Sequence, residues 1–415
     1  MTDLKRTGER AKAAAGALAC MRAPEKNRAL NAMADEVLRA TEEILSANAQ
    51  DVETARAGGM SEALVDRLAL TEKRIAAMAK GMRDVAELAD PVGRLLSGGT
   101  LDNGLRIERR TVPFGVIGII YEARPNVTGD AAALCFKSGN ACILRGGSEA
   151  VRSNAAIVQA MRRGLTRSGV NPDSVLMVED TSHETAQALM RLNEYLDLLI
   201  PRGGAGLIRR VVETATVPVI ETGVGNCHVY MEKSADIEMA TEIVFNAKTS
   251  RPSVCNAMET LLVDAQIAEA ALPAIAARLA EKHVELRGCP ETCRILPQAV
   301  AAAEEDYAKE FLDYILAVKV VDGIDAALAH IARYSTHHSE AIVTRDYAAA
   351  EKFVQRVDSA AVYVNASTRF TDGGEFGLGA EIGISTQKLH ARGPMGLEQL
   401  VSSKYIIRGE GQVRV

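Results

Sequence analysis

Short apolar segments alternate with amphipathic ones through most of this sequence, and that alternation restricts its fold more than any other feature. In the first half of the chain, the segments predicted as strands are 116–121, 141–144, 175–178, 196–200 and 217–220. Helical patterns lie between them, notably at 148–167 and 183–192. Strands that alternate with helices predict an α/β fold with a parallel sheet covered on both faces.

A second α/β region is expected from about residue 228. Its predicted strands are 259–263, 316–321, 340–344 and 361–365. Before the first sheet, apolar residues at helical spacing predict helices at 27–47 and 62–88, and Pro91 ends this pattern. An Asp102-Asn103-Gly104 turn predicts a hairpin within 98–110, and a last strand is expected at 404–408 after a glycine-rich stretch.

Composition excludes several classes of protein. The chain has 415 residues, which suggests two or three domains, and its net charge of -6 argues against a nucleic-acid or membrane-surface partner. It shows no signal segment and no apolar run that approaches a membrane span, so we expect a cytoplasmic protein. Its seven cysteines are irregularly spaced, which does not indicate a disulfide framework. Cys289 and Cys293 form a single close pair, so no metal is expected.

Cys255 is the first candidate for chemistry. The helical pattern before it breaks at 249–252, and a new segment begins near the cysteine, with Lys248 and Arg251 close by. Nearby cations lower the pKa of a thiol, and the thiolate is the nucleophile in acyl transfer. The alternative is a buried structural cysteine.

Asn126 follows an apolar strand, in a position where parallel sheets place ligand contacts. Its side chain could donate a hydrogen bond to a developing oxyanion. It could equally cap a helix that begins near Thr128.

Two glycine-containing turns join a predicted strand to a predicted helix. They span 144–149, which includes Arg145, and 201–206. Backbone NH groups at a helix start bind phosphate, and Arg145 would add a fixed positive charge. Neither turn has the GxGxxG pattern, and such turns are common without a ligand.

Two further groups of polar residues remain open. Glu221 follows a predicted strand, where a carboxylate could act as a general base or could be a solvated turn residue. His330, His337 and His338 lie close in sequence, but one is on a helix and two are adjacent in a turn. That arrangement is poor for a metal, so substrate hydrogen bonding or structural roles are expected.

Together these segments resemble the aldehyde dehydrogenase superfamily, and within it the family of gamma-glutamyl phosphate reductases. The resemblance covers essentially the whole chain, and its most specific part is 321–342. The segments 250–257 and 201–204 are also typical of this family. Two departures from hydrolytic relatives are Ser253-Val254 before the cysteine and the residues after Glu221, which leave the role of Glu221 open.

The resemblance implies specific site residues. Cys255 matches the catalytic cysteine, and Asn126 matches the asparagine that stabilises the oxyanion. Arg145 replaces a lysine that contacts the adenine ribose and would reach the 2′-phosphate of NADP. The other implied cofactor-binding residues are Ser148, Glu149, Gly203, Gly204 and Glu310. Candidates for contact with the substrate or its phosphate are Arg124, Lys248, Arg251 and His338.

The fold implied is aldehyde dehydrogenase-like, with a Rossmann-like cofactor domain, an α/β catalytic domain and a β extension for oligomerisation. We assign 1–98 and 114–226 to the NADP-binding domain, 227–388 to the catalytic domain, and 99–113 with 389–415 to the extension. The chain is then expected to form a homo-oligomer, either a dimer or a tetramer.

The activity implied is the NADPH-dependent reduction of L-glutamyl 5-phosphate to L-glutamate 5-semialdehyde, with release of phosphate, through a thioester on Cys255. This is the second step of proline biosynthesis from glutamate, and an association with glutamate 5-kinase is plausible because the substrate is labile. The alternatives are a hydrolytic NAD(P)-dependent semialdehyde dehydrogenase and a non-catalytic nucleotide-binding protein on the same fold.

Overall fold

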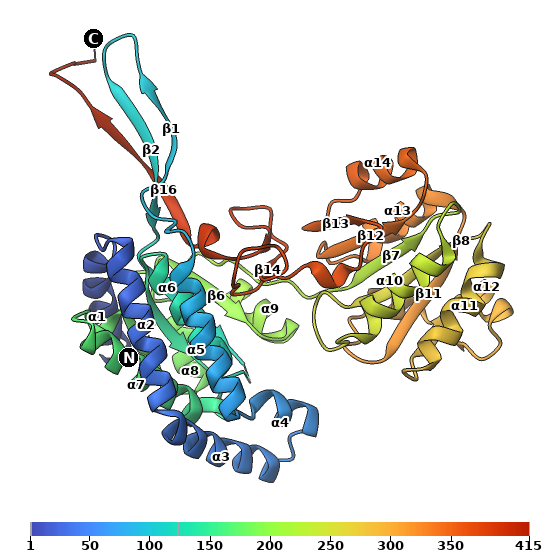
Figure 1. The fold of residues 1–415 in the computed structure, drawn as a ribbon, viewed down its shortest axis with the longest axis horizontal. Helices are drawn as coiled ribbons and strands as arrows, with labels where there is room; N and C mark the ends of the chain where they lie inside the picture. Colours follow the sequence, from blue (N-terminus) through green and yellow to red (C-terminus); the bar gives the residue numbers. More distant parts are fainter. Residues whose placement is uncertain (1, 123, 415) are drawn as a thin grey trace. The chain divides into compact units, whose positions relative to one another are not determined.

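The computed structural model describes residues 2–122 and 124–414, which divide into two compact units. Unit 1 contains 1–222, 377–383 and 395–415, and unit 2 contains 223–376 and 384–394. The two units are described separately below (Figure 1). None of the helices in the described part of the chain has both the length and the apolar character needed to cross a bilayer.

Unit 1 begins with a run of helices, and those after α1 overlap the segments predicted from apolar spacing. They are α1 (Thr2–Leu18), α2 (Ala23–Arg39), α3 (Thr41–Ala57), α4 (Glu62–Leu68) and α5 (Glu72–Glu87). The two long helices expected at 27–47 and 62–88 are each divided in two. Thr41 closes α2 because its hydroxyl donates to the carbonyl of Leu38. Thr71 starts α5 because its hydroxyl accepts from the backbone NH of Arg74.

The sheet of unit 1 has four parallel strands in the order β5-β4-β3-β6. They are β3 (Val116–Tyr121), β4 (Ala141–Arg145), β5 (Val175–Met177) and β6 (Leu198–Arg202). The strand predicted at 217–220 is wrong, because only an isolated bridge between Leu199 and Val219 forms there. The chain runs from β3 through β4 to β5 and then returns to place β6 on the other side of β3, so the strand order reverses between β3 and β6.

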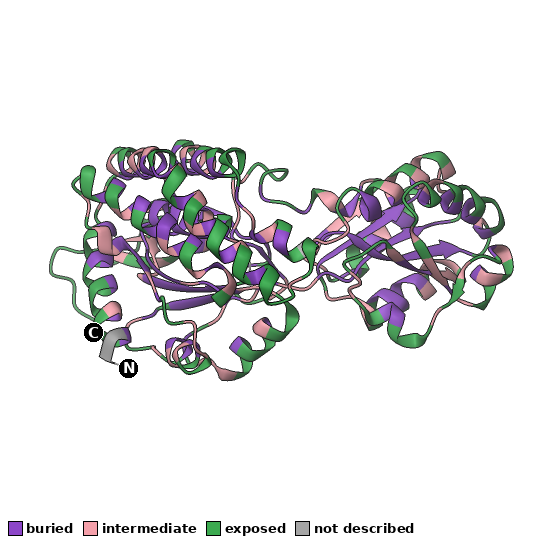
Figure 2. Ribbon diagram, turned by 90° about the horizontal axis from the view of Figure 1, so that it is seen from below, coloured by how far each residue is buried: buried purple, intermediate pink, exposed green. Residues whose placement is uncertain are grey.

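Helices cover this sheet. They are α6 (Asn126–Lys137), α7 (Val151–Arg167), α8 (His183–Met190) and α9 (Ala205–Thr214). Apolar residues of α1, α8 and α9 share one buried cluster with the strands. Helices α6 and α7 also contact the strands, and α2 packs against α5 and α7. The helices surround the strands, which are buried (Figure 2).

Unit 1 also carries a separate antiparallel sheet in the order β1-β2-β16. Its strands are β1 (Leu95–Thr100), β2 (Arg106–Pro113) and β16 (Val401–Arg408). The predicted hairpin is therefore present, and its turn lies between β1 and β2. Every residue of β1 is exposed, including Leu95 and Leu96.

Unit 2 contains seven parallel strands in the order β10-β9-β11-β8-β7-β12-β13. They are β7 (Cys227–Met231), β8 (Met258–Asp264), β9 (Glu285–Gly288), β10 (Val300–Ala301), β11 (Ile315–Val321), β12 (Ser339–Val343) and β13 (Ala361–Val364). The four strands predicted here are present as β8, β11, β12 and β13, and the other three were not predicted. A short ribbon of β14 (Ile384–Ser385) and β15 (Gly393–Pro394) completes the unit.

Two apolar layers enclose this larger sheet. The helices are α10 (Ile237–Thr249), α11 (Ala268–Ala280), α12 (Pro290–Ile295), α13 (Gly323–Tyr334) and α14 (Tyr347–Arg356). One buried cluster joins α10 and α11 to the strands, and a second joins α13 and α14 to them. A parallel sheet covered by helices was expected from the alternating sequence.

Candidate active site

The candidate site of unit 2 lies at the amino-terminal ends of parallel strands. Cys227 begins β7, Ser339 begins β12, and Cys255 lies in the turn just before β8. These three strands are neighbours, in the order β8-β7-β12. Because parallel strands start at the same edge of a sheet, three segments distant in sequence meet around Cys255.

The backbone of Cys255 is held from the start of β7. The thiol of Cys227 donates a hydrogen bond to the carbonyl oxygen of Cys255 over 3.2 Å. Gly225 lies against the same carbonyl so closely that a Cβ at position 225 would overlap its oxygen. Cys255 itself is half-buried, so the sealed structural cysteine considered from the sequence is not what the structure shows.

Glu310 reaches the same loop. The backbone NH of Gly225 donates to the Glu310 carboxylate over 2.7 Å. The structure therefore brings Glu310, predicted to bind the cofactor, to the glycine that contacts Cys255. Gly225 and Cys227 were not predicted as site residues, although a Gly-Val-Gly-Asn segment before a buried strand indicates close backbone packing.

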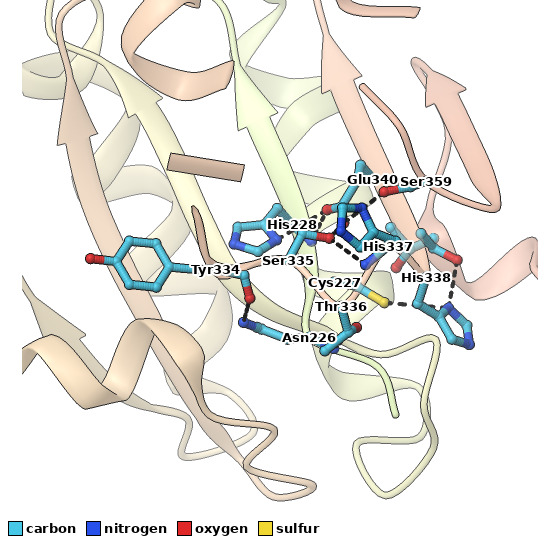
Figure 3. Close-up of polar contacts among 12 residues, drawn as sticks. Asn226, Cys227, His228, Tyr334, Ser335, Thr336, His337, His338, Glu340 and Ser359 are labelled. Carbon is cyan, nitrogen blue, oxygen red and sulfur yellow. Dashed lines mark hydrogen bonds and ion pairs between the residues drawn. The ribbon is translucent and has the colours of Figure 1, made fainter. Parts of the chain in front are cut away.

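The segment between α13 and β12 supports the start of β7, as Figure 3 shows. His338 is buried, its Nδ1 lies 2.8 Å from the hydroxyl of Ser339, and it lies 3.7 Å from the thiol of Cys227. Burial, reinforced by the charge of Glu340, raises the pKa of Cys227 well above its usual value. Cys227 therefore stays protonated and keeps the hydrogen that it donates to Cys255.

Asn226 and His228 fasten the same strand on either side of Cys227. The side-chain amide of Asn226 donates to the carbonyls of Tyr307 and Tyr334, each over 2.8 Å. The buried carboxylate of Glu340 accepts from the backbone NH of His228 over 2.7 Å and lies 3.0 Å from its Nδ1. Residues of the motif at 321–342 thus hold the start of β7, where Cys227 contacts the backbone of Cys255 (Figure 3).

Lys248 and Arg251, both predicted near the substrate, have different environments. The Lys248 ammonium is fully buried and pairs with the Glu259 carboxylate over 2.5 Å. Burial lowers the pKa of Lys248 and raises the pKa of Glu259, while the attraction between the two opposes both shifts. The structure thus gives Lys248 a partner within the protein, and the predicted substrate contact remains a prediction. Arg251 is exposed in the turn that carries Cys255.

The predicted cofactor residues of unit 1 come together at the carboxyl ends of β3, β4 and β6. Arg145 ends β4 beside β3, and Gly203 and Gly204 follow β6. The backbone NH of Gly204 donates to the carboxylate of Glu122 over 2.9 Å. The reversal of strand order between β3 and β6 is a location where open α/β sheets bind ligands.

Arg145 is half-buried beside this edge. Its guanidinium donates to the carbonyls of Thr181 and Ser182, over 2.5 and 3.3 Å. Its buried Nε has no hydrogen-bond partner within the described ranges. Ser148 is exposed at the start of a short 3₁₀ helix, Ser148–Ala150, which also contains Glu149.

Asn126 is the first residue of α6 and is exposed, and Pro125 occupies the capping position without a side-chain hydrogen bond. The alternative in which Asn126 caps this helix is therefore wrong. Its amide lies 3.5 Å from the Asp130 carboxylate, and burial raises the pKa of Asp130 to about 6. Arg124 is half-buried just before the helix. In the part of the chain that the structure describes, no group of three or more His, Cys, Asp or Glu side chains is placed to hold a metal.

Comparison with known proteins gives a consistent result. A model of the aldehyde dehydrogenase family matches residues 1–307. The gamma-glutamyl phosphate reductase of Moorella thermoacetica is 60% identical over 412 residues, which cover 99% of each chain. That of Heliobacterium modesticaldum is 58% identical over 413 residues, which cover 100% of this chain and 99% of the relative.

Solved structures give the same picture. The crystal structure of gamma-glutamyl phosphate reductase from Thermotoga maritima matches with a TM-score of 0.97 at 50% identity, over 99% of this chain and 100% of that one. An acetylating aldehyde dehydrogenase from Geobacillus thermoglucosidasius matches with a TM-score of 0.72 at 17% identity and shares the fold. The aldehyde dehydrogenase-like fold expected from the sequence is confirmed.

Proposed function

We propose that this chain, which belongs to the aldehyde dehydrogenase family and within it to the gamma-glutamyl phosphate reductases, reduces L-glutamyl 5-phosphate to L-glutamate 5-semialdehyde with NADPH. The chain is an oxidoreductase. The observation that carries the proposal is the 60% identity to a protein of that name along nearly the whole chain. The reaction would be the second step of proline synthesis from glutamate.

In the proposed mechanism the Cys255 thiolate attacks the carbonyl carbon of the acyl phosphate. The carbon–oxygen bond to the phosphate breaks, phosphate leaves with the electron pair, and a glutamyl thioester remains on Cys255. The contacts from Cys227 and Gly225 to the Cys255 carbonyl support this role, because a fixed backbone keeps the sulfur aligned during attack. After reduction of the thioester, the Cys255 sulfur leaves the carbon and the semialdehyde is released.

The negative charge that develops on the carbonyl oxygen needs hydrogen-bond donors. We assign Asn126 to this role, together with a backbone NH, because its sequence motif matches the family's asparagine. Each such donor is worth about 3 kcal/mol in acyl-transfer sites. Its exposed amide, which is not committed to capping α6, is compatible with the role.

The residues at the carboxyl edge of unit 1 fit a phosphorylated dinucleotide. The orphaned Nε of the half-buried Arg145 is a donor that a 2′-phosphate would satisfy. The exposed Ser148, with Glu149, Gly203 and Gly204, would hold the rest of the cofactor on this unit. Glu310, which belongs to unit 2, is a further proposed cofactor residue. NADPH, when bound, supplies the hydride that reduces the thioester.

The proposal extends to assembly and location. The strands of the β1-β2-β16 sheet expose apolar side chains, with Tyr405 65% and Ile407 59% exposed. Apolar exposure of this kind supports pairing with another subunit in a dimer or tetramer. A cytoplasmic location and an association with glutamate 5-kinase are part of the same proposal, because the acyl phosphate hydrolyses readily.

The test uses the reverse reaction, in which the semialdehyde is oxidised with NADP⁺. Wild-type turnover should require inorganic phosphate, and Cys255→Ala should abolish it while NADPH binding is retained. Cys20→Ala, at an exposed cysteine of unit 1, is the matched control and should be fully active. Turnover without phosphate would favour the hydrolytic alternative, and an active Cys255→Ala would exclude the covalent route.

A further inference from the structure

Arg369 spans the turn that carries Cys255. Its Nε donates to the hydroxyl of Ser250 over 3.0 Å, and its Nη1 donates to the side-chain oxygen of Asn256. Ser250 directly follows the last residue of α10, and Asn256 directly follows Cys255. The guanidinium therefore contacts both ends of the turn at 250–256. Arg251 and the candidate nucleophile Cys255 lie between these two ends.

The position of Arg369 is fixed by its own segment, a short 3₁₀ helix at Thr368–Phe370. The hydroxyl of Thr368 donates to the backbone carbonyl of Asn256 over 2.7 Å. In return the amide of Asn256 donates to the carbonyl of Thr371 over 2.9 Å. Reciprocal bonds of this kind preorganise the guanidinium before any ligand arrives.

The positive charges of Arg369 and Arg251 have no carboxylate within ion-pair distance among the described residues. Within the described residues, neither Arg369 nor Arg251 forms an ion pair with a carboxylate, whereas arginines elsewhere in unit 2 do, such as Arg278 with Glu242. Burial, and then the positive charge of Arg251, lower the pKa of Arg369. Asp372 acts in the opposite direction, but its Oδ1 accepts from the backbone NH of Gly374 over 2.8 Å.

Two guanidinium groups near one turn, neither of them paired with a carboxylate within the described residues, would attract an anion. Arginine suits a phosphate because its planar fork donates two parallel hydrogen bonds to neighbouring oxygens. In an acyl phosphate the phosphate is bonded to the carbon that Cys255 attacks, whereas the α-carboxylate of a glutamyl group lies at the far end of the molecule. The anion closest to Cys255 is therefore the phosphate.

We propose that Arg369, together with Arg251, binds the phosphate group of the substrate beside Cys255. The identity of that anion rests on the proposed function. In the forward direction the pair stabilises the phosphate as it leaves with the electron pair of its bond to carbon. In the reverse direction it holds inorganic phosphate, whose oxygen attacks the thioester carbonyl while the Cys255 sulfur leaves.

The experiment measures semialdehyde oxidation against phosphate concentration. Arg369→Gln should raise the KM for phosphate about tenfold or more, as loss of a charge-assisted hydrogen bond predicts, while the KM for the semialdehyde changes less than about twofold. Arg369→Lys keeps the charge without the fork and should lie between wild type and Arg369→Gln. Arg278→Gln, which removes a paired arginine of the same unit, is the control and should leave both constants unchanged.

Two outcomes would overturn the proposal. A rise in the KM for the semialdehyde without one for phosphate would mean that Arg369 binds the α-carboxylate. A fall in kcat with both KM values unchanged would mean that Arg369 only supports the turn.

A binding measurement separates this inference from the proposed function. Inorganic phosphate should slow the alkylation of Cys255 by iodoacetamide in the wild type and in Arg278→Gln but not in Arg369→Gln. This readout does not depend on turnover. If oxidation by the wild type needs no phosphate, the proposed function fails, and the alkylation result still decides whether the anion site exists.

Discussion

The buried thiol of Cys227 donates a hydrogen bond to the backbone carbonyl of Cys255 over 3.2 Å. One cysteine thus positions the backbone of the candidate nucleophile. Burial raises the pKa of Cys227, which favours the protonated form that donates this hydrogen bond. The two residues are 28 positions apart in sequence and meet because β7 and β8 are adjacent parallel strands. Cys227 is in this sense a positioning residue for the nucleophile.

Replacement of Cys227 by alanine should lower kcat about tenfold, because a shift of the Cys255 backbone moves the sulfur out of line with the carbonyl. Cys227→Ser retains a donor and should recover part of the rate. Steady-state kinetics and the rate of Cys255 alkylation measure the effect. Cys142→Ala, at an equally buried cysteine of β4, is the matched control, and an equal loss in that variant would contradict the positioning role.

Gly225→Ala should be far more damaging than an ordinary glycine substitution. The added methyl group would overlap the carbonyl oxygen of Cys255, so the turn must move, and a displacement of about 1 Å can cost about 100-fold in rate. Gly16→Ala, at a helical glycine with open space around its Cβ, should leave activity intact and raise the free energy of unfolding by about 0.5–1 kcal/mol. Activity in Gly225→Ala close to wild type would show that the contact carries no function.

Lys248→Met tests the buried ion pair. The substitution leaves the Glu259 carboxylate buried without its partner, which should lower the free energy of unfolding by about 3–5 kcal/mol. The double variant Lys248→Met, Glu259→Leu should regain much of that loss in urea unfolding. The folded fraction of Lys248→Met should keep the wild-type KM for phosphate. A large rise in that KM would show that Lys248 contacts the substrate, as the sequence predicted.

His330 makes stability depend on pH. Burial, with the charge of His228 next, lowers the pKa of His330 to about 3, whereas a histidine in an unfolded chain has its usual pKa of about 6.5. The unfolded chain then takes up the proton first as pH falls, so stability present above pH ~6.5 is lost as pH falls toward ~3. Between pH ~7.5 and ~5 the loss from this group is about 2 kcal/mol.

The variant His330→Leu should remove that part of the pH dependence in urea unfolding measured at both pH values. His183→Leu, at an exposed histidine of α8, should keep the wild-type slope. An identical slope in wild type and His330→Leu would show that His330 does not titrate as its burial requires.

Strands made of apolar residues, such as Val116–Tyr121 and Ile315–Val321, could be predicted from the sequence. The strand Cys227–Met231 was not predicted, because it begins with Cys and His. In the fold these two side chains have hydrogen-bond partners in Cys255 and Glu340, which lie far away in the sequence. The segment Glu285–Gly288 is polar and short, so its pairing depends on neighbours that no local pattern contains. In both segments, strand formation depends on contacts with residues that are distant in the sequence.

The site shows the same limit. Cys255 and its neighbours could be predicted because they form one short motif. The pairing of Lys248 with the buried carboxylate of Glu259 could not be predicted from the local motif, because it depends on how α10 packs on β8. Arg369 could not be predicted, because it lies 113 residues from Asn256 and meets it only through the return of the chain after β13.

The division of the chain into units has a consequence for synthesis. Unit 1 contains both residues 1–222 and residues 395–415, so its last strand, Val401–Arg408, leaves the ribosome after all of unit 2. Until then one edge of Arg106–Pro113 has no neighbour to accept its backbone hydrogen bonds. An unpaired edge during translation favours aggregation, so newly made chains should depend on chaperones more than chains whose domains close in order.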